Sequence, residues 1–128
     1  MIDKFLQHLR GYLIGIDCIS DAFAGIHLTG IASKKLPCLI VKQLDFDRGS
    51  AGQANVELAI EIHVNSLNMN DDLQLSLLVS STLEGASFAV SNKQSATLKW
   101  KSSKVNTTGE KRVITQNYIA MIMENNDD

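Results

Sequence analysis

The sequence lacks the short motifs that mark most enzymes. It contains no G-x-S-x-G nucleophile motif, no H-E-x-x-H zinc motif and no glycine-rich phosphate-binding loop. The three histidines, His8, His27 and His63, are widely separated, and neither cysteine lies in a recognisable nucleophile motif. Catalytic groups can be assembled from distant residues, so these absences lower the expectation of an enzyme rather than remove it. We expect a protein that is not an enzyme and that uses no cofactor.

Cysteine is also scarce. Cys18 and Cys38 form no C-x-x-C pair, and a secreted domain held together by disulfides would carry more cysteines. The sequence therefore predicts two reduced, largely buried thiols in a cytosolic protein. No basic segment precedes the first apolar stretch, and no run reaches the ~18 apolar residues of a membrane span. We expect neither a signal peptide nor a membrane partner.

The composition is that of an ordinary globular protein. The 128 residues are 45% hydrophobic and 20% charged, and the net charge is -2. A chain of this length can bury roughly two thirds of its unfolded surface, which is enough to fold without a disulfide or a metal. We expect one domain over residues 1–128, with a frayed acidic tail at 124–128. The nearly balanced charge gives no global reason to expect nucleic acid as a partner.

Two segments have the apolar spacing of helices. In residues 2–16 the apolar side chains fall within an arc of about 120° at 100° per residue, which predicts an amphipathic helix. A second helix is predicted to begin at a cap formed by Asn68 or Asn70 and to end at Gly85. Its apolar side is predicted to consist of Leu73, Leu75, Leu77, Val79 and Leu83.

The strongest strand signal lies in residues 56–64, where apolar and polar residues alternate. The polar stretch 45–55 before it is predicted to be a loop or an extended hairpin tip. Further strands are predicted at 23–28, 38–44, 87–91, 96–104 and 112–123. The fold class expected is α+β, an antiparallel β-sheet with two α-helices packed on one face, in the order α-β-β-β-α-β-β-β.

Two acidic stretches invite a metal interpretation. Glu57, Glu61 and His63 share one strand face, and two carboxylates with an imidazole can hold a divalent ion. No second acidic or histidine-rich motif supports this, so a solvated face with a weak ion pair is the favoured interpretation. The run from Asp45 to Gly49 fails as a calcium loop, because its twelfth position is Val56. We therefore predict no metal site.

The C-terminal third is basic. From Lys93 to Arg112 there are six basic residues and one acid. Lys99 and Lys101 flank Trp100, a pattern typical of nucleic-acid-binding strands. Strand alternation, however, puts Trp100 on the opposite face from both lysines. We therefore predict that Trp100 is in the core and that the lysines guard a sheet edge, with nucleic-acid binding by this hairpin as the alternative.

The order of the elements resembles a known family. The features are a strand opening with Pro37-Cys38-Leu39-Ile40-Val41, the alternating strand Val56–Asn65, a helix ending in Leu83-Glu84-Gly85, and a last strand with Tyr118-Ile119-Ala120-Met121-Ile122. Across nearly the whole chain, this layout is similar to the tail completion, or tail terminator, proteins of long-tailed bacteriophages and prophages.

The resemblance implies a non-enzymatic hexameric ring at the head-proximal end of the tail. Such a ring ends tail-tube polymerisation and joins the tail to the head connector. The implied partners are other copies of the chain, the tail tube protein, the connector protein and DNA in the lumen. The implied locations are the host cytoplasm during assembly and then the virion tail.

Charged residues on the predicted loop and strands are the candidate contacts for these partners. The expected interface residues are Asp45, Asp47, Arg48, Glu57, Glu61, His63, Lys99, Lys101 and Lys104. The alternatives are a nucleic-acid-binding module, a small hydrolase or ligand-binding domain built around residues 17–36, and another phage neck or tail protein.

Overall fold

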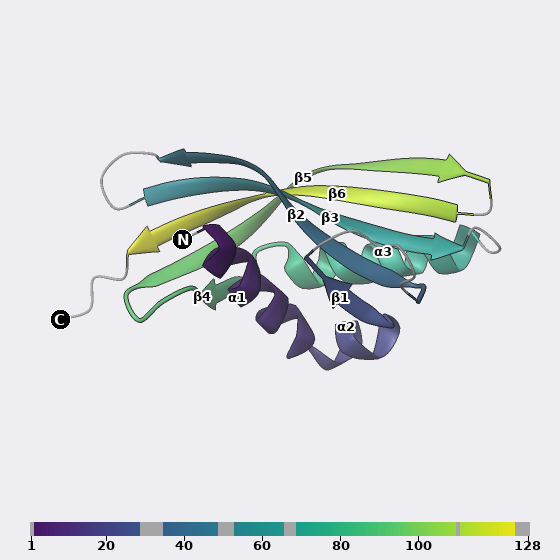
Figure 1. Cartoon of the computed structure of the whole chain (residues 1–128), viewed down its shortest axis with the longest axis horizontal. Coiled ribbons are helices and arrows are strands. Elements are labelled where there is room, and N and C mark those ends of the chain that lie inside the picture. The colour runs from purple at the N-terminus through teal and green to yellow at the C-terminus, as the bar shows by residue number, and fades with distance from the viewer. Residues whose placement is uncertain (1, 29–34, 49–52, 66–68, 110, 125–128) are drawn as a thin grey trace.

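The computed structural model describes residues 2–28, 35–48, 53–65, 69–109 and 111–124. Figure 1 shows one twisted sheet with the helices gathered on one side of it. The elements in chain order are α1 (Ile2–Ile14), α2 (Asp17–Ala22), β1 (Gly25–His27), β2 (Cys38–Arg48), β3 (Gln53–Asn65), α3 (Met69–Leu83), β4 (Ser87–Ala89), β5 (Gln94–Thr108) and β6 (Lys111–Glu124).

The sheet has six strands in the order β1-β2-β3-β6-β5-β4. Every pairing is antiparallel except that of β1 with β2, which is parallel. The chain between Gly25 and its partner Cys38 is long enough for the crossover that parallel pairing requires. The α+β class is therefore confirmed, while the expectation of a wholly antiparallel sheet is wrong at this edge.

A third helix, α2, was not predicted. It has six residues, and Ile19 is its one buried side chain, which is too short an apolar signal to show a helical period. The same helix explains an error about the thiols. Cys38 is buried as expected, but the neighbour of Ile19, Cys18, is exposed, because α2 turns Ile19 inward instead.

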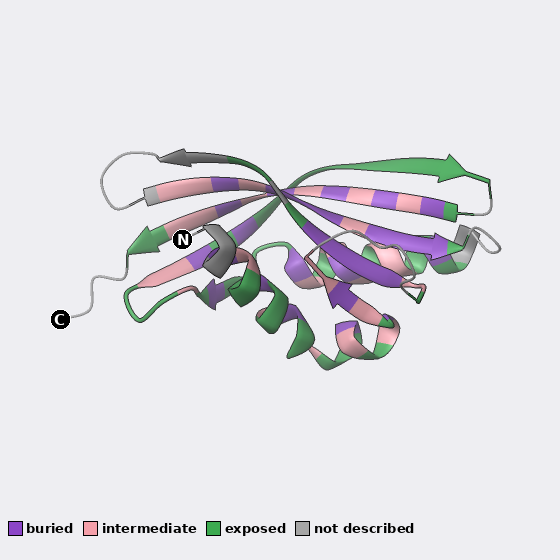
Figure 2. Cartoon of the chain, viewed as in Figure 1, coloured by how far each residue is buried: buried purple, intermediate pink, exposed green. Residues whose placement is uncertain are grey.

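The core lies between the sheet and the helices, and Figure 2 shows the buried positions alternating along β6. Helix α1 contributes Phe5, Leu9 and Leu13, as its apolar stripe predicts. Full burial of one large aliphatic side chain stabilises the fold by about 1.5–3 kcal/mol. The α1 stripe therefore attaches this helix firmly to the sheet.

Helix α3 buries part of the face expected, and beside it a polar side that was not expected. Val79 and Leu83 are fully buried, but Leu73 and Leu77 are 51% and 66% exposed. The side that faces the sheet includes Asp72 and Ser76, which bond to β6 and so replace the leucines inside.

The ends of α3 follow the expected signals in part. Asn70 is inside the helix rather than at its cap, and Asn68 falls outside the described residues. Gly85 follows the helix with φ +75°, a backbone conformation that favours glycine, so the predicted stop signal is confirmed. No helix in the described part of the chain is long and apolar enough to cross a membrane.

The strands are longer than the local patterns indicate. β2 continues to Arg48 and β3 begins at Gln53, so the stretch 45–55 is mainly an extended hairpin. Likewise, β5 continues to Thr108, beyond its predicted end at residue 104, and Gly109, where φ is +61°, follows it. Pairing with a neighbouring strand extends each strand beyond its own alternating residues.

Candidate functional site

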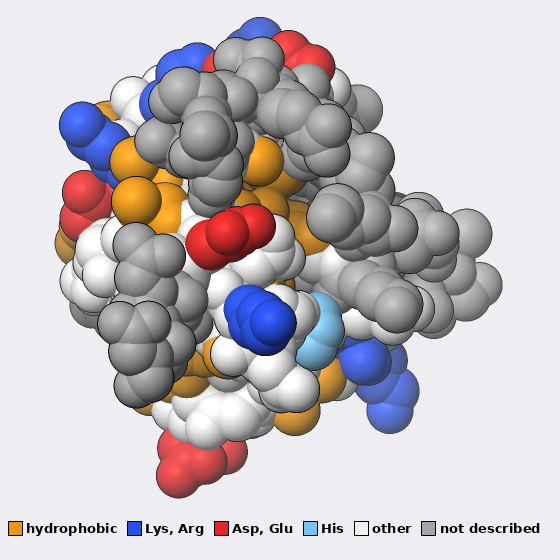
Figure 3. All heavy atoms as spheres, turned by 90° about the vertical axis from the view of Figure 1, so that its left-hand side faces the viewer, with side chains coloured by type: hydrophobic (Ala, Val, Ile, Leu, Met, Phe, Trp, Pro, Cys, Tyr) orange, Lys and Arg blue, Asp and Glu red, His pale blue; other side chains and the backbone are white. Residues whose placement is uncertain are grey.

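The sheet face opposite the helices, called the open face below, collects most of the predicted interface residues. Backbone register places Glu57, Glu61 and His63 on this face, opposite Ile119, Thr115 and Val113 of β6. The prediction that these three residues share one face is confirmed. Figure 3 shows a different part of the surface, the end of the molecule on the left of Figure 1, where charged side chains lie among polar and apolar ones.

Glu61 is the centre of one charged group. Its carboxylate accepts bonds from Lys42 Nζ at 3.0 Å and His63 Nε2 at 2.9 Å. Partial burial by itself raises the pKa of Glu61, but the hydrogen bonds from His63 and Lys42 and their charges outweigh it. The net pKa therefore lies below its ordinary value, and Glu61 is held as an anion.

Glu57 belongs to a second, separate pair. Lys101 Nζ lies 2.9 Å from Glu57 Oε1, and both side chains are nearly half exposed. The two carboxylates therefore contact different cations rather than converging. In the described ranges, no three His, Cys, Asp or Glu side chains are grouped as metal ligands would be. The arrangement suits recognition by charge and hydrogen bonding.

A β-bulge brings Lys104 to the open face, which Lys99 and Lys101 also occupy. Lys99 is opposite Ile119, and the register of β5 on β6 shifts between Trp100 and Ser102. Past this shift, Lys104 is opposite Thr115, the residue that also lies opposite Glu61. Without the bulge, strict alternation would put Lys104 on the helix side. Sequence reasoning missed the bulge, which has no marker residue.

Trp100 is not in the core, contrary to expectation. It lies on the helix side opposite the buried Tyr118, yet it is 42% exposed because the outer part of β5 extends beyond the helices. Its backbone N–H donates to Glu84 Oε2 at 2.5 Å, and its indole N–H donates to Ser103 Oγ at 3.1 Å. The lysines occupy the other face, as predicted. Nucleic-acid binding by this hairpin remains a prediction.

The acidic candidates of the first hairpin lie in a strand rather than a loop. Asp45 is exposed and lies opposite Glu57 after a second register shift. Asp47 and Arg48 pair through the backbone with Asn55 and Ala54, and their side chains fall outside the described set. Of the two predicted forms, a loop or an extended hairpin tip, the extended hairpin is therefore confirmed up to Arg48, because pairing with β3 continues to that residue.

Beneath the sheet, a buried polar network joins α3 to β6. Arg112 Nη1 donates to Asp72 Oδ2, and Gln116 Nε2 donates to the backbone oxygen of Ser76 at 2.8 Å. The Tyr118 hydroxyl donates to Gln116 Oε1 at 2.6 Å. Burial, helped by the charge of Glu84, raises the pKa of Tyr118 well above its ordinary value. Sequence reasoning missed this network. The signal in the sequence was that Asp72 and Ser76 lie on the side of α3 that faces the sheet.

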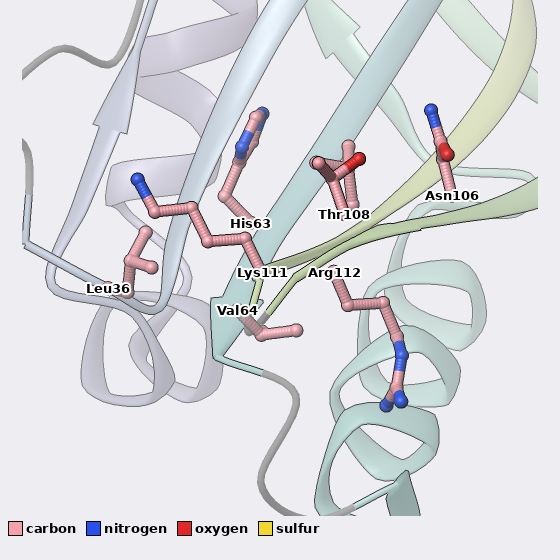
Figure 4. Close-up of a pocket in the computed structure, with 8 residues that line it drawn as sticks. Leu36, His63, Val64, Asn106, Thr108, Lys111 and Arg112 are labelled. Carbon is pink, nitrogen blue, oxygen red and sulfur yellow. The ribbon is translucent and has the colours of Figure 1, made fainter.

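The surface has two hollows near predicted residues. The first holds about 190 Å³ at the end of the open face, and in Figure 4 His63 and Lys111 point to one side while Arg112 points toward α3. The second holds about 400 Å³ and is lined by Gln7, Arg10, His27 and Leu28. None of these four described side chains is a carboxylate, hydroxyl or thiol. The expectation that the chain is not an enzyme stays a prediction.

Comparison with known proteins gives a likeness of fold. The sequence matches no known family profile and no curated protein sequence. The structure is similar to a chain in the virion of a native gene transfer agent particle, with a TM-score of 0.59 and 16% sequence identity. The match covers 78% of this chain and 79% of that chain. At this identity, the likeness establishes a shared fold.

Proposed function

We propose that this chain is a structural component of a phage-like virion. More specifically, it forms a closed ring at the head-proximal end of the tail, ends tail-tube polymerisation and joins the tail to the head connector. The observation that carries the proposal is the fold shared with a chain of a gene transfer agent virion over about four fifths of both chains. The element order that resembles tail completion proteins supports the specific role.

The open face suits protein contacts. Its charges are arranged as local pairs, Glu61 with Lys42 and His63, and Glu57 with Lys101. Such pairs hold side chains in one geometry and allow a partner surface of matching polarity to be recognised. Lys99 and Lys104 remain available to acidic patches of a neighbour or to DNA in a lumen. A ring that repeats one contact by rotation needs two different surfaces on each subunit.

The direct test uses the virus or prophage that encodes the chain. Deleting the gene should leave heads and tail tubes that form but do not join, with tubes longer than normal in electron micrographs. Supplying the gene in trans should restore joined particles of normal length. Normal, joined tails in the deletion strain would refute the tail role.

The ring itself is tested on the purified 14.0 kDa protein. Light scattering coupled to size exclusion, over a range of concentrations, is expected to show a discrete species near six subunits. A variant with Arg48→Glu should fold normally and fail to end tube growth, with Lys93→Glu, at the turn before β5, as the matched charge-change control. Unchanged tail length with Arg48→Glu would remove this hairpin from the capping surface.

A further inference from the structure

Among the described residues, the two edge strands β1 and β4 pair with only part of β2 and β5. β1 pairs with β2 from Cys38 to Ile40, and β4 pairs with β5 from Ser95 to Thr97. Beyond these short strands lie two segments of equal length, Val41–Arg48 (the β2 edge segment) and Lys101–Thr108 (the β5 edge segment). A strand at the edge of a sheet is a template for pairing with another strand.

Every residue of the β5 edge segment is exposed rather than buried, and apolar side chains lie beside the segment. Glu84 bonds to the backbone of Trp100, which places one flank of α3 next to β5. Leu73 and Leu77 lie on that flank, because helical spacing puts them in line with Glu84. On β5 itself, Trp100 and Val105 are 42% and 55% exposed. The segment therefore has an apolar border on its helix side.

The β2 edge segment carries the matching features. Leu44 at its bulge is 57% exposed. Of the seven exposed large apolar side chains among the described residues, two lie on β5 (Trp100 and Val105), two on the adjacent flank of α3 (Leu73 and Leu77) and one on β2 (Leu44). Soluble monomers rarely gather exposed apolar side chains in this way.

The two segments also carry different charges: the β2 edge segment has two acids and two bases, and the β5 edge segment has two bases and no acid. The β5 edge segment contains Lys101 and Lys104 and no acid, whereas the β2 edge segment contains Asp45 and Asp47. Lys42, in the same β2 segment, is already paired with Glu61.

We propose that the β5 edge segment of one copy receives the β2 edge segment of a second copy as an added antiparallel strand. This contact rests on the proposed ring and specifies how its subunits join. Three antiparallel pairings separate β2 from β5, so the two strands run in opposite directions within one subunit. A second copy that continues the sheet therefore presents its β2 antiparallel to β5, as this contact requires.

Aligning the two segments end to end gives a specific register. Leu44 of one copy then lies opposite Val105 of the next, and Asp45 lies opposite Lys104. Within each subunit, Asp45 and Lys104 are both on the open face, opposite Glu57 and Thr115. Facing residues of an antiparallel pair must share a face, and this register meets that requirement at the charged pair but not before the bulge at Leu44. The proposed pairing therefore covers positions 44–47, opposite 102–105.

A charge swap tests the register on the full-length protein. Asp45→Lys or Lys104→Glu alone should weaken self-association at least tenfold, measured by light scattering across concentrations. The two changes together in one chain should restore association. Lys99→Glu is the matched control, because it is on the same face but outside the segment, and it should have little effect. If both single variants associate as strongly as the original chain, the proposed contact is wrong. A ring built through another contact would still be possible.

Covalent trapping gives a second readout that needs no stable ring. In a Cys18→Ser background, Leu44→Cys and Val105→Cys in one chain should form a ladder of disulfide-linked oligomers on mild oxidation. Either change alone should give at most linked dimers. A ladder supports the contact, and a double variant that resembles the single ones overturns it. The tail-length experiment judges the proposed function separately, so the two failures are distinguishable.

Discussion

The ion pair between Asp72 and Arg112 is the interaction whose loss we expect to cost this fold most. Asp72 and Arg112 are 4% and 9% exposed, and they join the first turn of α3 to the start of β6. Removing one partner leaves a buried charge without compensation, which costs about 3–5 kcal/mol. A domain of this size has a total stability of about 5–15 kcal/mol. Asp72→Asn or Arg112→Met should therefore use up a large part of the total.

The double variant separates the pair from its surroundings. With Asp72→Leu and Arg112→Met together, neither charge of the pair is buried. The free energy of unfolding should then differ from that of the original chain by no more than about 1–2 kcal/mol. Asp71→Asn is the control for the helix dipole, because Asp71 is in the same first turn but exposed. It should cost no more than about 1 kcal/mol.

The measurement is urea unfolding followed by circular dichroism for all four variants. The midpoint should shift strongly for the singles while the slope against urea stays constant. Two results would refute the reasoning. One is a single variant that loses less than about 1 kcal/mol, and the other is a double variant that loses the sum of the singles.

Two further predictions concern pH and glycine. The pKa of Glu61 is lowered in the fold, so its contribution to stability is present above its ordinary value of 4.5 and is lost as the pH falls through the lowered value. Glu61→Gln should cost about 1 kcal/mol at pH 7 and progressively less below pH 4.5, and a pH-independent cost in urea unfolding would contradict this. Gly85→Ala should destabilise by about 1 kcal/mol because φ is +75°, whereas Gly11→Ala, in open space on α1, should stabilise by about 0.5–1 kcal/mol. Thermal unfolding of the two alanine variants checks the opposite signs.

Part of the candidate site could be predicted from the sequence because it depends on local alternation. Glu57, Glu61 and His63 are two or four residues apart in one strand, so any regular strand puts them on one face. Lys104 could not be placed in this way, since its face depends on a bulge in the pairing of β5 with β6. The exposure of Trp100 likewise depends on how far the helices extend beneath β5, which no local pattern records.

The sequence by itself determined those helices and strands whose spacing of apolar residues can be read within a single segment. The apolar stripe of α1, the alternation of β3 and the stop at Gly85 need only nearest-neighbour geometry. Tertiary structure alone decided the register shifts at Leu44 and Lys101, the burial of Asp72 with Arg112, and the two partly covered sheet edges. Each of these depends on which distant strand or helix lies alongside, and contacts far apart in the chain leave no period in the sequence.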